Sequence, residues 1–160
     1  MNIKIIISIA LLFILGLIVE LLNNKEKNNT NIDYNKYYKK DYIMTQAELK
    51  FYRQLKMITN ELNLSIFPQV NLERIINVKN NDNAYRNRIK SRSIDYTIVN
   101  NENCKIICCI ELDDYSHNYN DRQKRDKFIN ELFENVNIKL YRYNLNTNIE
   151  NIKQNIIDCI

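Results

Sequence analysis

The chain has 160 residues, of which 45% are hydrophobic and 26% are charged. That length allows one domain with a core of its own. One Gly and one Pro exclude collagen-like chains, Gly-rich or Pro-rich linkers and the Gly-rich loops that cradle phosphates. One His excludes a zinc site built on two histidines. The net charge of +4 is compatible with an anionic partner but is too small to indicate one.

The N-terminal stretch is strongly apolar. Ile5–Val19 reads IIISIALLFILGLIV, without a charge, and Lys4 precedes it. Residues 1–22 are therefore predicted to form an uncleaved transmembrane anchor, because no small-residue cleavage site follows the run. Lysines are more frequent after the run than before it, beginning with Lys25 and Lys27. This excess predicts a single-pass membrane protein whose C-terminal domain is cytoplasmic.

The rest of the chain divides into a short polar segment and a globular part. Residues 23–41 are rich in Asn, Lys and Tyr and lack periodicity, so they are predicted to be a polar tether. Residues 42–160 form the predicted domain. Its cysteines lack the spacing of a metal site and are predicted to be reduced thiols, as in a reducing compartment. They are Cys104, Cys108, Cys109 and Cys159.

The first half of the domain is predicted to run from a helix into a strand and a loop. Thr45-Gln46-Ala47-Glu48 is a capping box, and apolar residues follow at helical spacing as far as Leu62. Residues 64–72 have strand composition, and Pro68 within them predicts an edge position or a bulge. A basic, Asn-rich loop is expected over residues 79–92.

Two further strands, residues 93–99 and 104–112, are separated by a turn and predict a hairpin. Ile106–Ile110 is continuously apolar, which is typical of a strand covered on both faces. A helix over 120–136 should follow.

The chain is then predicted to end with a strand over residues 138–143 and a helix that a second capping box opens at Thr147. The predicted fold class is α/β. The predicted order is α-β-β-β-α-β-α, with a mixed central sheet flanked by helices behind the N-terminal anchor.

The acidic residues after the third strand are the main functional signal. Glu111 and Asp113 lie two apart on a strand, so both point to the same face. Hairpin pairing brings Asp95 to the level of residue 108, from which a bulge or strand twist would let it approach Glu111. Desolvated carboxylates that meet must be protonated, paired with Arg or Lys, or bound to a cation. Three of them at one sheet edge suit a hard divalent cation such as Mg²⁺.

The helix after this segment adds a cation to the same place. Its apolar stripe, extended back by one turn, has Arg125 at its centre, so Arg125 is predicted to point inward. An inward Arg beside carboxylates either pairs with them or binds a phosphate. Structural pairing of Asp95 and Glu111 with Arg125 and Arg142 is therefore the alternative to a chemical role.

Together these residues resemble a known group of proteins. The ordered set resembles the restriction-endonuclease-like PD-(D/E)XK superfamily, in particular its very-short-patch-repair-like branch and related bacterial domains of unknown function. The resemblance covers about residues 44–143 and includes the opening helix with Glu48 and the strand Phe67-Pro68-Gln69-Val70. The set consists of Asp95, Ile110-Glu111-Leu112-Asp113-Asp114 with His117, Arg125-Asp126, and Leu140-Tyr141-Arg142.

The resemblance implies a metal-dependent nuclease that hydrolyses phosphodiester bonds of nucleic acid, with DNA as the expected polymer. Asp95 and Glu111 match the superfamily's metal-binding acids, and Asp113 stands where its usual motif has a lysine. Mg²⁺ or Mn²⁺ would be held by Asp95, Glu111 and Asp113. His117 would accept or shuttle a proton, and Arg125 would stabilise charge on phosphoryl oxygens.

Other residues have supporting roles in this interpretation. The catalytic set is Asp95, Glu111, Asp113, His117 and Arg125, with possible additional members Glu48, Asp126 and Arg142. The basic loop would hold the nucleic-acid backbone through Arg86, Arg88, Lys90 and Arg92.

Two other hypotheses stay open. The first is a non-catalytic module on the same fold that binds nucleic acid or a protein. The missing lysine and the modest positive charge favour it. The second is a structural membrane protein whose acids are only ion-paired.

Overall fold

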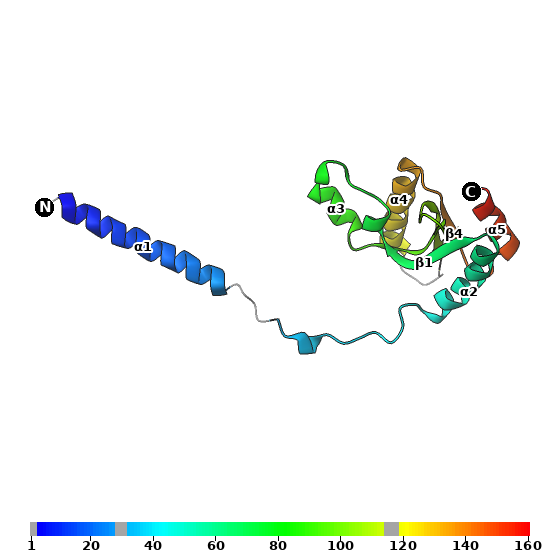
Figure 1. The fold of residues 1–160 in the computed structure, drawn as a ribbon, viewed down its shortest axis with the longest axis horizontal. Helices are drawn as coiled ribbons and strands as arrows, with labels where there is room; N and C mark the ends of the chain where they lie inside the picture. Colours follow the sequence, from blue (N-terminus) through cyan, green and yellow to red (C-terminus); the bar gives the residue numbers. More distant parts are fainter. Residues whose placement is uncertain (1–2, 28–31, 114–118) are drawn as a thin grey trace. The chain divides into compact units, whose positions relative to one another are not determined.

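The structure is a computed structural model that describes residues 3–27, 32–113 and 119–160. It divides into two units, residues 1–41 and 42–160. The first unit contains helix α1 (Ile3–Lys27) and the 3₁₀ turn η1 (Tyr34–Lys36) (Figure 1). The remaining elements belong to the second unit, called the globular unit below.

The predicted transmembrane anchor is contradicted. Within the described residues, no helix is both long enough and apolar enough to cross a membrane. The uncharged run Ile5–Val19 in α1 has 15 residues. At 1.5 Å per residue it extends about 22 Å, against about 30 Å for the hydrocarbon core of a bilayer. The prediction of an anchor over residues 1–22, and of a single-pass membrane protein with a cytoplasmic C-terminal domain, is corrected accordingly.

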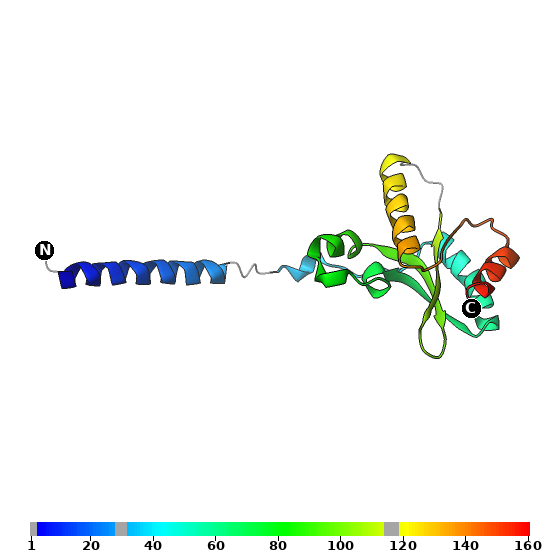
Figure 2. The same cartoon turned by 90° about the horizontal axis from the view of Figure 1, so that it is seen from above.

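The globular unit is built on a four-stranded mixed sheet in the order β1-β2-β3-β4 (Figure 2). β1 (Leu64–Asn71), β2 (Ser93–Asn100) and β3 (Ile106–Leu112) are antiparallel to their neighbours, and β4 (Leu140–Tyr143) runs parallel to β3. The α/β class and the mixed sheet agree with the sequence prediction. β1 is an edge strand, as Pro68 indicates.

Helices cover both faces of this sheet (Figures 1 and 2). α2 (Gln46–Glu61) and α5 (Ile149–Ile157) pack on one face. The 3₁₀ turn η2 (Leu72–Arg74), α3 (Asn83–Ile89) and α4 (Tyr119–Asn135) pack on the other. The largest buried apolar side chains of the two layers are Phe51, Leu55, Ile152 and Ile156 on the first face, and Leu72 and Phe133 on the second.

Strand β3 lies between these two layers. Cys108 packs into the first layer and its neighbour Cys109 into the second, because side chains alternate along a strand. Both are free thiols, as predicted. Burial raises the pKa of the Cys108 thiol, and it raises that of Cys109 to about 12. Both thiols therefore stay protonated and act as small apolar side chains.

Local signals explain where the helices begin. The Thr45 hydroxyl accepts a hydrogen bond from the amide of Glu48 (3.2 Å), and the Glu48 carboxylate accepts one from the amide of Thr45. The capping box of α2 is therefore confirmed. The second predicted box is wrong, because Asn148 caps α5 while the Thr147 hydroxyl accepts from the amide of Asn144.

The segment predicted as a basic loop is partly helical. The 3₁₀ turn η3 (Lys79–Asn81) is followed by α3, whose start is capped by the Asp82 carboxylate. That carboxylate accepts a hydrogen bond from the amide of Ala84 at 2.8 Å. The basic residues of this segment are therefore held on a short helix and in the turn behind it.

Asparagine occupies several turns whose backbone is left-handed. Asn63, Asn80, Asn81 and Asn137 have φ between 51° and 56°. Asn adopts this conformation more readily than most residues, because its short amide bonds to nearby backbone groups. Gly16, the one glycine of the chain, lies in α1.

Candidate active site

Strands β2 and β3 bring two predicted site residues together. Tyr96 pairs with Ile110, so the next position along places Asp95 at the level of Glu111. The expected level was residue 108. A bulge between Ile98 and Val99 and the connection over residues 101–105 account for the difference. The two carboxylates therefore lie level with each other, and a bulge contributes to this register, as the sequence interpretation allowed.

Asp95 is half-buried and accepts several hydrogen bonds. Its Oδ2 accepts from the amide of Leu112 at 2.8 Å, and its Oδ1 accepts from Nε2 of Gln69 at 3.2 Å. Glu111 lies beside it on the neighbouring strand. Burial, with the charge of Glu48 nearby, raises the pKa of Asp95 above its ordinary value, and the hydrogen bonds limit the rise.

Glu111 is the more perturbed of the two acids. Burial raises its pKa, and the charge of Asp95 raises it further, to about 8. The more distant charges of Arg142 and Arg125 oppose this rise. At neutral pH the pair therefore holds a proton, which Glu111 carries.

Gln69 completes this network, and the sequence interpretation missed it. It lies in β1 directly after Pro68, with φ of 52°, and the β1–β2 pairing skips it. Its Nε2 donates to Oε1 of Glu48 (2.9 Å) as well as to Asp95, and its Oε1 accepts from the hydroxyl of Ser93 (3.1 Å). The left-handed backbone at Gln69 interrupts the pairing opposite Asp95, and its side-chain amide lies between two acids. The resemblance included the strand Phe67-Pro68-Gln69-Val70, but Gln69 was given no role in the site.

Arg142 organises a second set of side chains. Its Nη1 lies 3.2 Å from Oδ1 of Asp113, and its Nη2 lies 3.5 Å from Oδ1 of Asp126. Its Nε donates to Oδ1 of Asn130 at 3.1 Å. Arg142 pairs in parallel register with Glu111, so this set lies next to the Asp95–Glu111 pair. The charges of Asp113 and Asp126 are thus largely neutralised within the protein.

A pocket of about 380 Å³ is lined by members of both groups, that of Asp95 and Glu111 and that of Arg142. Arg125 lies at its wall with a side chain that is 55% exposed, so it faces the pocket from α4 but is not the inward residue that its helix stripe predicts. The lining includes Arg92, Asp95, Glu111, Arg125, Asp126 and Arg142. His117 and Asp114 fall outside the described residues, so the role expected of His117 stays a prediction.

The donor set bears on the predicted metal. In the part of the chain that the structure describes, no three His, Cys, Asp or Glu side chains are grouped to hold a metal ion. Asp95 and Glu111 do meet, however, and Mg²⁺ is usually bound by one or two carboxylates while it keeps several waters. A divalent cation could replace the proton between them. Asp113, the third expected metal ligand, forms an ion pair with Arg142 instead.

Of the four residues expected to contact nucleic acid, only Arg92 lines the acidic pocket. Arg86 pairs with Glu73, and Arg88 lies over the ring of Tyr85 at 5.6 Å. Arg92 lies over the ring of Phe128 at 5.5 Å and lines the acidic pocket. Lys90 is exposed.

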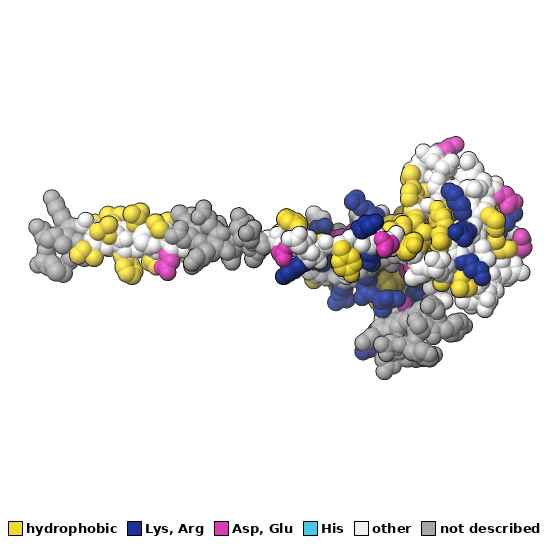
Figure 3. Space-filling model, turned by 90° about the horizontal axis from the view of Figure 1, so that it is seen from below, with side chains coloured by type: hydrophobic (Ala, Val, Ile, Leu, Met, Phe, Trp, Pro, Cys, Tyr) yellow, Lys and Arg dark blue, Asp and Glu magenta, His cyan; other side chains and the backbone are white. Residues whose placement is uncertain are grey.

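The surface charge is scattered on the face that Figure 3 shows. In the right-hand part of that view, Lys and Arg side chains lie apart from one another among uncharged and hydrophobic side chains. The described side chains there form no continuous basic surface.

Comparison with known proteins gives a family but no close relative. No curated protein and no solved structure matches the chain. A family model described as a protein of unknown function (DUF2726) matches residues 40–160, which include the whole globular unit and its acidic site. The chain therefore belongs to the DUF2726 family.

Proposed function

We propose that the globular unit is a metal-dependent nuclease on a restriction-endonuclease-like core. One observation carries the proposal. Asp95 and Glu111, both half-buried, lie level with each other on neighbouring strands and line one pocket. Neither forms an ion pair with a residue that the structure describes. Two adjacent desolvated acids destabilise a fold, so their placement favours a role in binding a cation.

The order of the site residues along the chain adds support. Asp95, Glu111, Arg125 and Arg142 come from β2, β3, α4 and β4, in the order that the superfamily resemblance implies. All four line one pocket. Sequence order and spatial grouping are independent observations, and these four residues satisfy both.

The proposed roles follow from the contacts. Asp95 and Glu111 would hold Mg²⁺ or Mn²⁺, and Gln69 would keep Glu48 beside them. Such an ion, when bound, lowers the pKa of a bound water and offsets charge on a phosphoryl group. Arg125, exposed at the wall of the pocket, would hold a phosphate oxygen of the substrate.

A second function is favoured by Asp113. It stands where the superfamily's usual motif has a lysine, and it is ion-paired with Arg142. A site without that lysine lacks one cation that would stabilise the transition state. A module that binds nucleic acid or a protein without cleaving it is therefore the alternative.

A cleavage assay separates the two. The full chain is incubated with labelled single- and double-stranded DNA and RNA in Mg²⁺ or Mn²⁺, with EDTA as one control. Glu111→Ala is compared with Glu102→Ala, which removes an exposed acid from the β2–β3 turn. We expect cleavage that is lost in EDTA and in Glu111→Ala and kept in Glu102→Ala. Binding without cleavage by folded protein would establish the alternative.

A further inference from the structure

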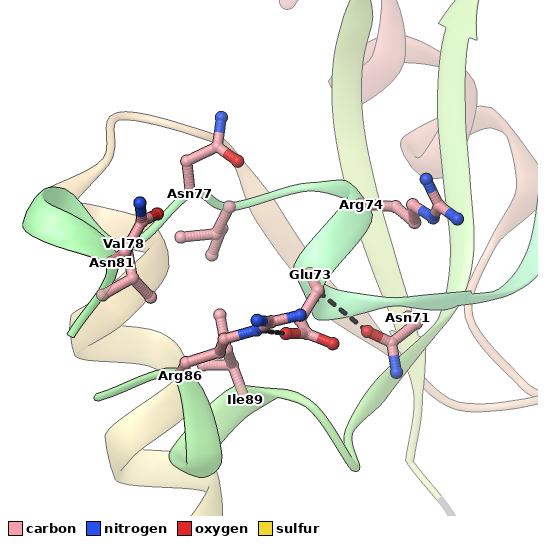
Figure 4. Close-up of a pocket in the computed structure, with 9 residues that line it drawn as sticks. Asn71, Glu73, Arg74, Asn77, Val78, Asn81, Arg86 and Ile89 are labelled. Carbon is pink, nitrogen blue, oxygen red and sulfur yellow. Dashed lines mark hydrogen bonds and ion pairs between the residues drawn. The ribbon is translucent and has the colours of Figure 1, made fainter. Parts of the chain in front are cut away.

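A second pocket has a volume of about 720 Å³ (Figure 4). Ile76, Val78 and Ile89 give it apolar walls. Glu73 and Arg86 face each other within it and form an ion pair. Asn77 and Asn81 bring exposed amide groups to its rim. The lining is therefore mostly polar, with a smaller apolar part, so the pocket offers several hydrogen-bonding groups to a ligand.

Successive parts of one turn of the chain line the two pockets. Ile89 lines the larger pocket, whereas Ser91, Arg92 and Ser93 line the acidic one. The turn is fixed to the end of β1, because the amide of Leu72 donates to the carbonyl of Arg92 at 2.9 Å. The Asn71 side chain also donates to the carbonyl of Lys90 at 2.7 Å. A chain-like ligand can therefore pass from one pocket to the other across residues 89–93.

The segment around the larger pocket has the charge of a nucleic-acid site. Residues 74–92 contain six Lys and Arg residues and one acid, Asp82. Two of the cations lie over aromatic rings, Arg88 over Tyr85 and Arg92 over Phe128. Tyr85 is 62% exposed. Cations interleaved with aromatic side chains are typical of surfaces that bind single strands.

We infer that the larger pocket binds an unpaired nucleobase of the strand whose phosphate lies at Asp95 and Glu111. This inference rests on the proposed function, because it takes the ligand of the acidic pocket to be nucleic acid. The apolar walls suit the face of a base. Along the edge of the base, Glu73 would accept hydrogen bonds and Arg86 would donate them. The amides of Asn77 and Asn81 can do both. A paired base is stacked and has its edge occupied, so the substrate is a single strand or a duplex with an unpaired segment.

The test is a scan with abasic nucleotides. Full-length protein is titrated in EDTA, which prevents cleavage, against fluorescent single strands that each lack one base at a different position. We expect a loss of affinity of about fivefold or more at one position and less than about twofold at the others, given the usual contribution of one bound base. Blunt duplex of the same sequence should bind more weakly than the intact strand.

Variants connect the affected position to the pocket. In Arg86→Ala and Asn77→Ala, the penalty for the missing base should fall to less than about twofold, because the base has lost its contacts. Arg53→Ala and Asn60→Ala, on the exposed side of α2, remove the same groups elsewhere and should leave the penalty unchanged. A variant that weakened binding only by misfolding would weaken it equally for intact and abasic strands.

The outcomes also separate this inference from the proposed function. Cleavage of intact strands in Mg²⁺, together with a flat abasic scan, would overturn the base pocket and leave the nuclease. A position-dependent scan without cleavage would keep the pocket and overturn the nuclease. Equal affinity for the blunt duplex and the single strand would overturn the inference.

Discussion

Glu111 and Asp113 lie two residues apart at the end of β3, yet their surroundings are opposite. Asp113 is 3.2 Å from Arg142, which also binds Asp126. Glu111 meets another acid, Asp95, and has no ion pair within the described part of the chain. The protein thus neutralises one carboxylate with its own arginine and leaves its neighbour with a proton.

The difference shows how to tell a structural acid from a functional one. An ion pair such as Asp113–Arg142 links β4 to the end of β3 and stabilises the fold modestly. A pair of desolvated acids raises the free energy of the folded state, unless a proton or a cation lies between them. The pair Asp95–Glu111 therefore needs a proton or a cation between its carboxylates, whereas the charge of Asp113 is already compensated by Arg142. The four predictions below test this contrast.

The largest expected effect is on cleavage. Glu111→Ala should lower kcat/KM in Mg²⁺ by more than about 100-fold, because it removes a proposed metal ligand worth several kcal/mol in the transition state. Asp113→Ala should lower it by less than about tenfold. Equal losses of kcat/KM in Glu111→Ala and Asp113→Ala would show that the different surroundings of the two acids do not matter for cleavage.

The next effect is the pH dependence of stability. Folded Glu111 keeps its proton up to about pH 8, whereas unfolded Glu111 loses it near its ordinary pKa of 4.5. This stabilisation is complete below the unfolded pKa and is lost as the pH rises through about 8. After allowance for solvent screening at a half-buried group, the free energy of unfolding should fall by about 2 kcal/mol between pH 5 and pH 8.

Urea denaturation at several pH values measures this fall. Glu111→Gln, which cannot ionise, is the matched variant and should show a clearly smaller decrease over the same range. Mg²⁺ should restore stability at pH 8 in the unmutated protein only. Parallel pH profiles for the two proteins would contradict the raised pKa of Glu111.

The structural acids should respond to the loss of their arginine. Arg142→Ala leaves Asp113 and Asp126 without their shared partner and should lower the free energy of unfolding by about 1–2 kcal/mol. Arg142→Lys should recover only part of the lost stability. Lys keeps the positive charge, but it cannot bind both carboxylates with one planar group. Both are measured by urea denaturation. No change in Arg142→Ala would mean that these ion pairs are fully replaced by water.

The smallest effect concerns Gln69. Because its φ of 52° favours glycine, Gln69→Gly should be more stable than Gln69→Ala by about 1 kcal/mol, the reverse of the usual order in a strand. Both variants should cleave more slowly, since neither can bridge Glu48 and Asp95. Thermal denaturation compares the pair. A more stable Ala variant would argue against a left-handed Gln69.

Strong local patterns predicted much of this fold. The capping box at Thr45, the apolar run of β3 and Pro68 at a sheet edge all depend on neighbours in the sequence. The level of Asp95 against Glu111 was missed because a bulge between Ile98 and Val99 sets it. Such a bulge depends on how the whole sheet packs.

The candidate site shows the same division. Acids on successive strands could be found from spacing alone, but the partner of each acid could not. Whether Arg142 pairs with Glu111 or with Asp113 depends on side-chain direction at the end of β4. Similarly, helix periodicity placed Arg125 on the inner stripe of α4, yet the pocket leaves its side chain more than half exposed. Periodicity gives the direction of a side chain but not what covers it.

The left-handed asparagines have a consequence for how this domain can be encoded. Most folds close such turns with glycine, whose codons begin with two guanines, whereas asparagine codons begin with two adenines. Asn63, Asn80, Asn81 and Asn137 let the globular unit close its turns without any glycine. A genome poor in guanine and cytosine can therefore carry this fold intact. Four of its left-handed positions carry a residue whose codons begin without guanine or cytosine.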